Sequence, residues 1–399
     1  MRILFLSSVY PSRTAATRGT YNRDLCRALS ATCDVRVISP VSWTERLRNK
    51  EACQAEEEEP VESCRPLYWY PPRFLRHRYG QCMWHSVHRC VARTVEEFQP
   101  DWVLSYWAHP DGEAALEAAR TCGARSGVII GGSDVLLLTK NSRRREAICR
   151  VLRESDSVFT VCDGLRERVI ELGGSPERTH TTYQGIDGNL FSKGSQKEAR
   201  QKLGVDVDVP LFLWVGRIER VKRLDVLLTA FCAVRRTLPD AKLRLVGSGS
   251  LNADIQSFVR QHHLDDSVEF VGPVDRRVLA RCYRAADAVV LSSDSEGLPN
   301  VLREALACGT PFVSTNVGSV NEIADDTHSL LVPQGDAEAL QRAMLRVLDS
   351  SFREGAQAYV PQSWLDAAAR FVDLMQLDGT SLTPPQTKPS SEIIQPLAT

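Results

Sequence analysis

Short apolar runs recur along the chain and alternate with amphipathic stretches that are long enough to form helices. Many of the runs are bounded by Gly, Pro or Asp. Continuous apolar strands that alternate with helices are typical of parallel sheets with both faces covered, so the pattern predicts an α/β fold. The runs occupy residues 3–6, 35–38, 102–104, 128–130, 158–161 and 179–183, and then 211–215, 243–246, 268–271, 288–291 and 311–314.

The runs fall into two groups, which predicts two Rossmann-like, doubly wound domains. The break lies near residues 184–187, and a polar stretch at 191–208 follows before the strand pattern restarts. Ligands of such sheets bind beyond the carboxyl ends of the strands, so we expect a site in the cleft where the domains face each other. The expected units are an N-terminal domain at 1–187, a second domain at 188–360, a closing helix at 361–377 and a disordered tail at 378–399.

The composition is that of a globular protein with no bulk attraction to nucleic acid. The 399 residues carry a formal net charge of −1, and 43% of them are hydrophobic. No apolar run approaches the roughly 18 residues of a membrane span, and the first run is too short for a signal peptide. Twelve cysteines occur without a C-x-x-C pair, a usage typical of a reduced, cytoplasmic protein.

Two cations and a glycine follow the first two strands of the second half. Arg217 and Lys222 come after the run 211–215, and Gly247 follows the run 243–246. Fixed cations at the carboxyl end of a strand can stabilise phosphate groups without a metal. A glycine lets the backbone approach a phosphate or a base closely. The alternatives are surface charges at a strand–helix turn and an ordinary tight turn.

Two glutamates bracket the start of a predicted helix that begins near Pro299. Glu296 lies in the preceding loop, and Glu304 shares one helix face with Asn300. The free N–H groups at a helix start form an anion site, and carboxylates can accept hydroxyl protons from a ribose or another sugar. The Gly-Leu-Pro-Asn loop and the mostly apolar helix disfavour the alternative of two solvated surface charges.

These motifs, in this order, strongly resemble the retaining family-4 glycosyltransferases. The resemblance runs from residue 1 to about residue 377. It implies the GT-B fold, in which two Rossmann-like domains face each other across a cleft, the first on the acceptor side and the second binding a nucleotide-sugar donor. The motifs that carry it contain Gly216, Arg217, Lys222, Gly247, Glu296 and Glu304.

The resemblance also implies roles for individual residues. Arg217 and Lys222 would neutralise the diphosphate of the donor. Glu304 would bind its ribose hydroxyls, and Glu296 would hold its sugar. The catalytic set would include Arg217, Lys222 and Glu296. The other implied donor-binding residues, near the diphosphate, the base or the sugar, are Gly19, Gly247, Val274, Leu298, Pro299, Asn300 and Val301.

A histidine in the N-terminal half extends the resemblance to teichuronic-acid-type transferases of cell-surface polysaccharides. His109 lies in Tyr-Trp-Ala-His-Pro-Asp-Gly, and Asp134 lies in Gly-Gly-Ser-Asp. The resemblance implies that His109 is a catalytic residue beside the donor sugar and that Asp134 lies near the acceptor. The alternative for His109 is a structural imidazole whose hydrogen bonds are satisfied within the fold.

The resemblance implies retaining transfer of a hexose-type sugar from a nucleotide-diphosphate sugar to a hydroxyl of a glycan or lipid-linked acceptor. It also implies a place in cell-surface polysaccharide synthesis. No carboxylate can be assigned as a covalent nucleophile, which favours a same-face displacement. Two other functions stay open: a nucleotide-sugar 2-epimerase of similar fold, and a non-catalytic nucleotide-sugar-binding module.

No metal or other cofactor is expected, although two patterns look like metal ligands. Residues 206–208 read Asp-Val-Asp but lie in a polar linker, so we interpret them as solvated charge. The second pattern lies on one predicted helix, and a single helix rarely supplies a closed tetrahedral site. Its members are Cys82, His85, His88 and Cys90.

Aromatic and basic residues are mixed at 69–79, and a second basic run lies at 143–145. Such surfaces suit peripheral contact with anionic lipid or with a lipid-linked acceptor. The alternative is a partly buried aromatic loop beside a solvated basic face. We therefore expect a cytoplasmic protein, and the first interpretation adds contact with the inner face of the membrane.

Overall fold

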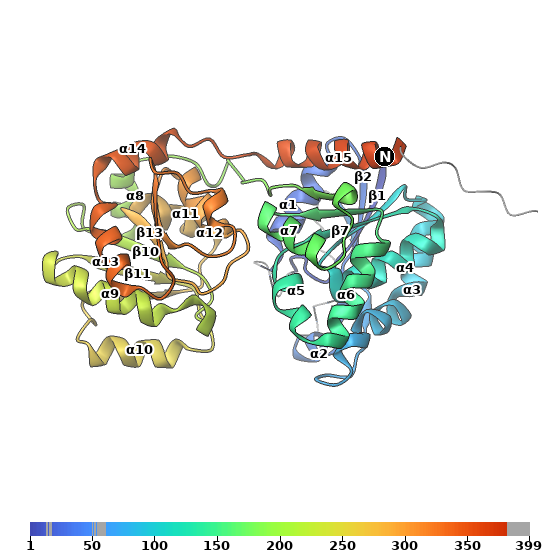
Figure 1. The fold of residues 1–399 in the computed structure, drawn as a ribbon, viewed down its shortest axis with the longest axis horizontal. Helices are drawn as coiled ribbons and strands as arrows, with labels where there is room; N and C mark the ends of the chain where they lie inside the picture. The colour runs from blue at the N-terminus through green and yellow to red at the C-terminus, as the bar shows by residue number, and fades with distance from the viewer. Residues whose placement is uncertain (13–14, 16–17, 50, 52, 54–60, 381–399) are drawn as a thin grey trace, which may run out of the picture.

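The computed structural model contains two large parallel sheets, each accompanied by helices (Figure 1). It describes residues 1–12, 15, 18–49, 51, 53 and 61–380. The predicted fold class, with two Rossmann-like sheets, is confirmed. The tail predicted at 378–399 lies, from residue 381 onward, outside the described residues.

The first sheet has seven strands in the order β4-β2-β1-β6-β7-β8-β9. Alternate residues of β1 face different cores: Phe5 packs in one apolar cluster and Leu4 in another. Both faces of this strand are buried, which explains its continuously apolar sequence. The strands are β1 (Arg2–Leu6), β2 (Asp34–Ile38), β4 (Glu62–Cys64), β6 (Trp102–Tyr106), β7 (Arg125–Ile130), β8 (Ser157–Thr160) and β9 (Thr179–Thr181).

Helices cover both faces of this sheet. Met83 of α3 and Ala114 of α4 pack in the cluster that contains Leu4, whereas Leu25 of α1 and Ile148 of α6 pack in the other. A small two-stranded sheet joins β3 (Val41–Ser42) to β5 (Leu67–Tyr68). The helices are α1 (Thr20–Leu29), α2 (Trp43–Arg48), α3 (Tyr79–Phe98), α4 (Glu113–Cys122), α5 (Ser133–Leu136), α6 (Ser142–Glu154) and α7 (Asp163–Glu171).

The second sheet has six strands in the order β12-β11-β10-β13-β14-β15 and its own core. The strands are β10 (Leu211–Val215), β11 (Lys242–Val246), β12 (Val268–Gly272), β13 (Ala288–Leu291), β14 (Phe312–Thr315) and β15 (Ser329–Val332). The helices are α8 (Gln196–Leu203), α9 (Leu224–Thr237), α10 (Asn252–Gln261), α11 (Arg276–Ala285), α12 (Asn300–Ala307), α13 (Ala337–Arg346) and α14 (Ser350–Ala358).

Each sheet has one place where the strand order reverses. In the first sheet this place lies between β1 and β6, and in the second it lies between β10 and β13. In doubly wound sheets the crevice at the carboxyl ends of the two strands at such a switch point is where ligands bind. The loops after these four strands are therefore where a site is expected.

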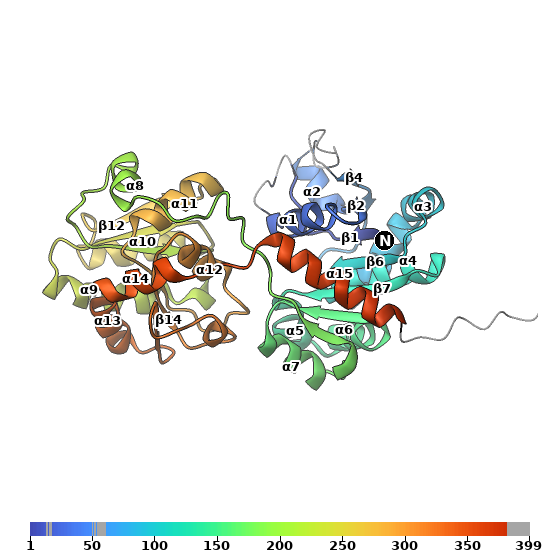
Figure 2. The ribbon, with the colours of Figure 1, turned by 90° about the horizontal axis from the view of Figure 1, so that it is seen from above.

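The last helix, α15 (Trp364–Thr380), returns to the first half of the chain (Figures 1 and 2). Phe371 packs in the first core, with its ring centroid 4.8 Å from that of Phe159. Where the chain returns, the amide of Ile186 donates to the carbonyl of Gln362 over 2.8 Å. The two halves are therefore joined by two adjacent crossings.

Candidate active site

The loops after β10 and β11 approach each other closely at the carboxyl edge of the second sheet. Gly247 has a φ of +127°, and a side chain at this position would collide with the carbonyl oxygen of Gly216. Only glycine tolerates both the backbone conformation and the contact. The predicted residue Gly247 therefore shapes this edge, and its contact with a donor stays a prediction.

The loops after β10 and β13 meet through an ion pair at the second switch point. Nζ of Lys222 lies 2.6 Å from Oε1 of Glu296, and Oγ of Ser293 donates to the same oxygen over 2.5 Å. The Lys222 and Glu296 side chains are 20% and 10% exposed. Arg217 lies on the same loop as Lys222 and is exposed. Two predicted residues that are far apart in the sequence are thus in direct contact.

The carboxylate of Glu304 is held by a tyrosine from the neighbouring helix α11. The fully buried Tyr283 donates from its hydroxyl to Oε2 of Glu304 over 2.9 Å. Burial raises the pKa of Glu304 to about 7, against the opposing effects of Tyr283, Arg276 and Arg303. The sequence reasoning missed Tyr283, because an apolar-face tyrosine on an amphipathic helix looks like any core residue.

The start of α12 bridges the two halves of the chain. Pro299 is the N-cap residue of this helix and has no side chain that could cap its first N–H groups. Leu298 packs against the first core, and Val301 packs against the second. Nδ2 of Asn300 donates to Oε1 of Gln184 over 2.9 Å. The structure thus places the predicted segment between the two cores.

Two further predicted residues lie at the ends of strands or starts of helices. Gly19 is the N-cap of α1, has a φ of +72°, and would collide with the carbonyl oxygen of Val9 if it carried a side chain. Val274 follows Gly272, whose φ is +77°, and is partly buried against the second core. Residues at the start of a helix or just after a strand can contact a ligand. For Gly19 and Val274 such contacts stay predictions.

His109 is fully buried after β6 and faces two groups of the N-terminal half. Its Nε2 donates to the carbonyl of Arg76 over 2.9 Å, and its Nδ1 lies 3.3 Å from Oε2 of Glu113. Arg150 of α6 also contacts the Glu113 carboxylate. In this arrangement the ring is engaged within the N-terminal half. Its place beside a donor sugar stays a prediction.

Asp134 is also fully buried, and it organises the loops after β6 and β7. Its carboxylate accepts from the amides of Gly132, Val135 and Ala108 over 2.9, 3.2 and 3.3 Å. Burial raises the pKa of Asp134 to about 6 despite these hydrogen bonds. Its side chain therefore fixes backbone next to His109, and proximity to an acceptor stays a prediction.

Glu322 is a residue between the halves that the sequence reasoning missed. Its carboxylate accepts from the amides of Asp163 and Gly164, and from the hydroxyl of Tyr183, over 2.9 Å each. Glu322 follows β14, whereas the donors belong to the first half. The sequence around Glu322 carries no motif, so only the folded chain reveals this contact.

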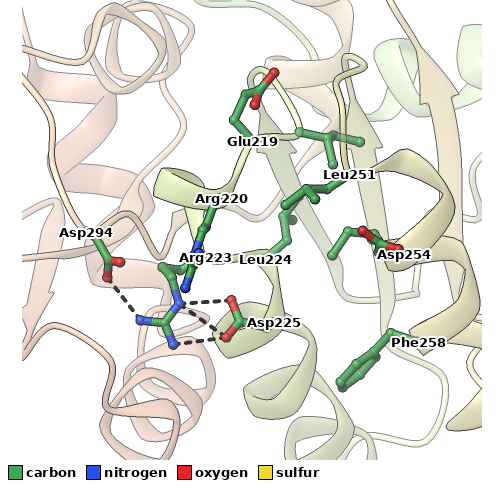
Figure 3. A pocket seen from close by; sticks show the side chains of 11 residues that line it. Glu219, Arg220, Arg223, Leu224, Asp225, Leu251, Asp254, Phe258 and Asp294 are labelled. Carbon is green, nitrogen blue, oxygen red and sulfur yellow. Dashed lines mark hydrogen bonds and ion pairs between the residues drawn. The ribbon is translucent and has the colours of Figure 1, made fainter. Parts of the chain in front are cut away.

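A pocket of about 610 Å³ lies beside the loop that contains Lys222, between the start of α9 and α10 (Figure 3). In it Nη1 of Arg223 donates to Asp294 over 3.1 Å, and Nη2 donates to Asp225 over 2.9 Å. The Arg223 cation is therefore neutralised by two carboxylates. None of the predicted site residues lines this pocket, so we do not assign a donor to it.

A second pocket, of about 590 Å³, lies between the halves and is a better candidate for access to the site. It is next to an ion pair in which Nη1 of Arg276 lies 2.9 Å from Oδ2 of Asp24. Arg276 also acts electrostatically on Glu304. The pocket is lined by Thr20, Arg23, Asp187, Asn189, Leu190, Asp275, Arg276 and Arg277.

The described residues include no group of three or more His, Cys, Asp or Glu side chains that could hold a metal ion. In the helical cluster singled out from the sequence, Nδ1 of His85 contacts the carbonyl of Gln81, and Nδ1 of His88 contacts the carbonyl of His85, each over 2.8 Å. Within the same described ranges, no helix is long and apolar enough to cross a membrane.

Two family models match consecutive parts of the chain. The model described as "Glycosyl transferase 4-like domain" matches residues 18–185, and the model described as "Glycosyl transferases group 1" matches residues 195–362. Solved structures share the fold. Sucrose-phosphate synthase from Thermosynechococcus elongatus superposes with a TM-score of 0.78, at 22% identity, over 95% of this chain and 99% of its own. Anabaena HepE in complex with UDP gives 0.72, at 18% identity, over 94% and 100%.

The two sheets, with charged loops at their switch points, have the GT-B fold. The chain is 28% identical to TuaC of Bacillus subtilis, named as a glycosyltransferase of teichuronic acid biosynthesis, over 87% of this chain and 89% of TuaC. It is 34% identical to a D-inositol 3-phosphate glycosyltransferase of Saccharomonospora viridis, a match that spans 56% of each chain. The chain belongs to the family-4 glycosyltransferases and is a glycosyltransferase.

Proposed function

We propose that the chain is a retaining, metal-independent glycosyltransferase. It would move a hexose-type sugar from a nucleoside-diphosphate sugar to a hydroxyl of a glycan or lipid-linked acceptor. The observation that carries this proposal is the ion pair of Lys222 and Glu296, 2.6 Å apart at the second switch point, with Glu304 on the helix that follows. A cation, a carboxylate and a helix start converge there on the place where the fold binds ligands.

The ion pair supplies a binding step in which Lys222 exchanges one partner for another. Without donor, Glu296 neutralises the Lys222 ammonium group. When a diphosphate enters, its oxygens replace the carboxylate as partners of Lys222, and the exposed Arg217 adds a second cation. Glu296 is then released to accept hydrogen bonds from sugar hydroxyls. Donor binding thereby orders the two charges that the reaction needs.

The same cations assist the chemistry. As the glycosidic bond breaks, negative charge grows on the leaving phosphate, and fixed cations stabilise that charge without reorganising. The acceptor hydroxyl attacks from the face that the diphosphate leaves, and a phosphate oxygen takes its proton. The bond to the acceptor forms as the bond to the phosphate breaks, and because both lie on the same face of the sugar, the anomeric configuration is retained. The protein contributes position and charge.

Binding and transfer assays test this proposal directly. Thermal-shift measurements with a panel of nucleotide-sugars should reveal one donor class that stabilises the chain. Lys222→Ala should remove most of that shift, whereas Lys197→Ala, an exposed lysine on α8, should keep it. Activity should persist in a chelator. Strict dependence on an added divalent ion, or an unchanged shift in Lys222→Ala, would contradict the proposal.

Three functions are distinguished by the acceptor that is used and the product that forms: transfer, epimerisation and binding alone. The likeness to TuaC favours cell-surface polysaccharide synthesis, although other relatives are named for inositol-phosphate and L-malate acceptors. A nucleotide-sugar 2-epimerase would convert donor without any acceptor. Incubation with donor alone should therefore give only slow hydrolysis and no epimer. A stoichiometric epimer would replace transfer as the proposed reaction, and no turnover with any acceptor would favour a binding module.

We extend the proposal to contact between the N-terminal half and an anionic lipid surface. Phe74 and Leu75 are 73% and 50% exposed. Arg73 and Leu75 have backbone φ values of 69° and 46°, which residues other than glycine rarely adopt. A strained turn that exposes an aromatic ring and a leucine suits insertion between lipid headgroups. In Figure 1 this turn is the light-blue loop beneath α2.

Cations surround this turn. The short helix after it (Arg76–Arg78) contacts α6, whose residues 143–145 are all arginine. Burial, followed by the positive charge of Arg76, lowers the pKa of Arg144, so like charges lie close together. Clustered cations beside exposed apolar side chains attract anionic headgroups.

Vesicle flotation tests the lipid contact. The chain should bind vesicles of phosphatidylcholine with phosphatidylglycerol and should not bind phosphatidylcholine alone. A double variant, Phe74→Ser with Leu75→Ser, should lose this binding, whereas Leu365→Ser, on the exposed face of α15, should keep it. Equal binding to both vesicle types, or full binding by the double variant, would contradict the contact.

A further inference from the structure

Two cysteines of the N-terminal half face each other between a strand and a helix. Cys64 ends β4 at the edge of the first sheet, and Cys90 lies in the middle of α3. Their sulfur atoms are 3.1 Å apart. A disulfide bond is about 2.05 Å long, so the atoms need to approach by only about 1 Å, a movement within reach of side-chain rotation.

We propose that Cys64 and Cys90 form a reversible disulfide, a modification site outside the transferase centre. Both side chains are partly exposed, so a small oxidant can reach them. Neither residue takes part in the donor chemistry proposed above. The pair therefore adds a property that the glycosyltransferase fold does not require.

The surroundings make the two thiols unequal. A hydrogen bond from Cys64 is the main cause that lowers the pKa of Cys90 to about 7, with support from the charge of Arg93. The hydrogen bond with Cys90, burial and the nearby Glu62 raise the pKa of Cys64. A thiolate attacks disulfides whereas a thiol does not. Cys90 is therefore placed to react first and Cys64 second.

The reaction balances with a small-molecule disulfide such as oxidised glutathione. The Cys90 thiolate attacks one sulfur of the oxidant and releases one glutathione thiolate. Cys64 then gives up its proton and attacks the Cys90 sulfur, which releases the second. Two protein thiols are oxidised by two electrons, and the oxidant is reduced to two thiols that take up the two protons.

The bond would close a loop over residues 65–89. This loop contains the exposed turn at Phe74 and Leu75 and the carbonyl of Arg76 that holds His109. Oxidation would tie together the two ends of the segment that we propose contacts lipid. This consequence rests on the proposed function, whereas the formation of the bond does not.

Peptide mapping of the full chain tests the bond. The chain is equilibrated in glutathione buffers of increasing oxidised fraction, its free thiols are alkylated, and it is digested with trypsin. Cleavage after Lys and Arg, except before Pro66, leaves Cys64 on the peptide 51–73 together with Cys53, and leaves Cys90 on the peptide 90–93. We expect these two peptides to become linked as the buffer becomes more oxidising and to separate again with dithiothreitol.

Matched variants identify the partners. Cys53→Ser and Cys82→Ser should keep the linked peptides, and Cys64→Ser and Cys90→Ser should abolish them. If a variant does not fold, fragmentation of the linked wild-type peptide still distinguishes Cys53 from Cys64. The oxidised chain should melt at a temperature on the order of 5 °C higher, because the cross-link restricts the unfolded chain. Full alkylation of Cys64 and Cys90 across the buffer series would overturn the proposal. The peptide map does not depend on transferase activity, so a failure of the proposed function would not change its result.

Discussion

The loops at the two switch points hold their charged groups in different ways. In the second half, Lys222 and Glu296 neutralise each other at a partly exposed place, and Arg217 is exposed beside them. In the first half, His109 and Asp134 are fully buried and face backbone or side-chain groups of the same half. The two sheets share the same order of strands around the switch point, and the first has one strand more. The difference indicates that the second half keeps charged side chains available to bind a ligand. The first half uses its polar side chains to hold the backbone in place.

The largest effect should come from the exchangeable cation. We expect Lys222→Ala to lower transferase turnover by roughly 10²–10³-fold, because a fixed charge that stabilises the leaving phosphate is lost. Its melting temperature should change little, since the side chain is partly exposed and only its partner Glu296 loses a neighbour. Steady-state kinetics with the donor from the thermal-shift screen measures this. Lys197→Ala serves as the control for the loss of one positive charge. If Lys222→Ala kept wild-type turnover, the claim that the second half supplies the catalytic charge would be wrong.

The buried carboxylate of the first half should behave in the opposite way. Asp134→Ala removes the acceptor of three backbone amides, so we expect it to destabilise the fold by about 2 kcal/mol. Thermal denaturation should show a clear decrease in melting temperature, whereas Glu304→Gln should shift it much less. If Asp134→Ala melted with the wild type and lost only activity, Asp134 would belong to the reacting groups and the comparison would fail.

The apolar runs predicted the interior strands well because burial on both faces leaves a continuous apolar sequence. Two strands of the large sheets, and the two short strands β3 and β5, escaped that reasoning. β4 and β15 lie at the outer edges of their sheets, and their sequences, Glu-Ser-Cys and Ser-Leu-Leu-Val, are short and only partly buried. An edge strand pairs on one side only, so its sequence needs less apolar character.

The candidate site was predictable where its chemistry lies in local motifs. Lys222 and Glu296 each stand in such a motif, although their contact across the sheet appears only in the folded chain. Tyr283 and Glu322 carry no motif, and their roles depend on which element packs beside them. Sequence patterns thus reveal the side chains that are expected to bind a ligand. They miss the side chains that hold other residues in position.

Donor affinity should depend on pH through Glu304. Burial raises the pKa of this carboxyl group to about 7, so it is mostly protonated at pH 6 and mostly ionised at pH 8. The ionised form accepts ribose hydroxyls better, so we expect UDP to bind about tenfold more tightly at pH 8 than at pH 6. The nucleotide's own phosphate ionisation is controlled for with Glu304→Gln, which should lack this part of the pH dependence. Identical pH profiles for the two proteins, measured by calorimetry, would show that Glu304 does not contact the ribose.

The smallest effect should come from the ion pair that joins the halves beside the interdomain pocket. Asp24 lies on α1, whose N-cap is Gly19, and Arg276 lies on α11, which also carries Tyr283. Asp24→Asn keeps the shape and a hydrogen bond but removes the charge, so we expect donor affinity to fall only about threefold. The difference in donor affinity between the two proteins should be smaller at high salt, because dissolved ions screen a partly exposed ion pair. Calorimetric titration of both proteins at low and high salt measures this difference. A loss of a hundredfold would mean that the first half supplies charge directly to the donor, and that the contrast between the switch points is too sharply drawn.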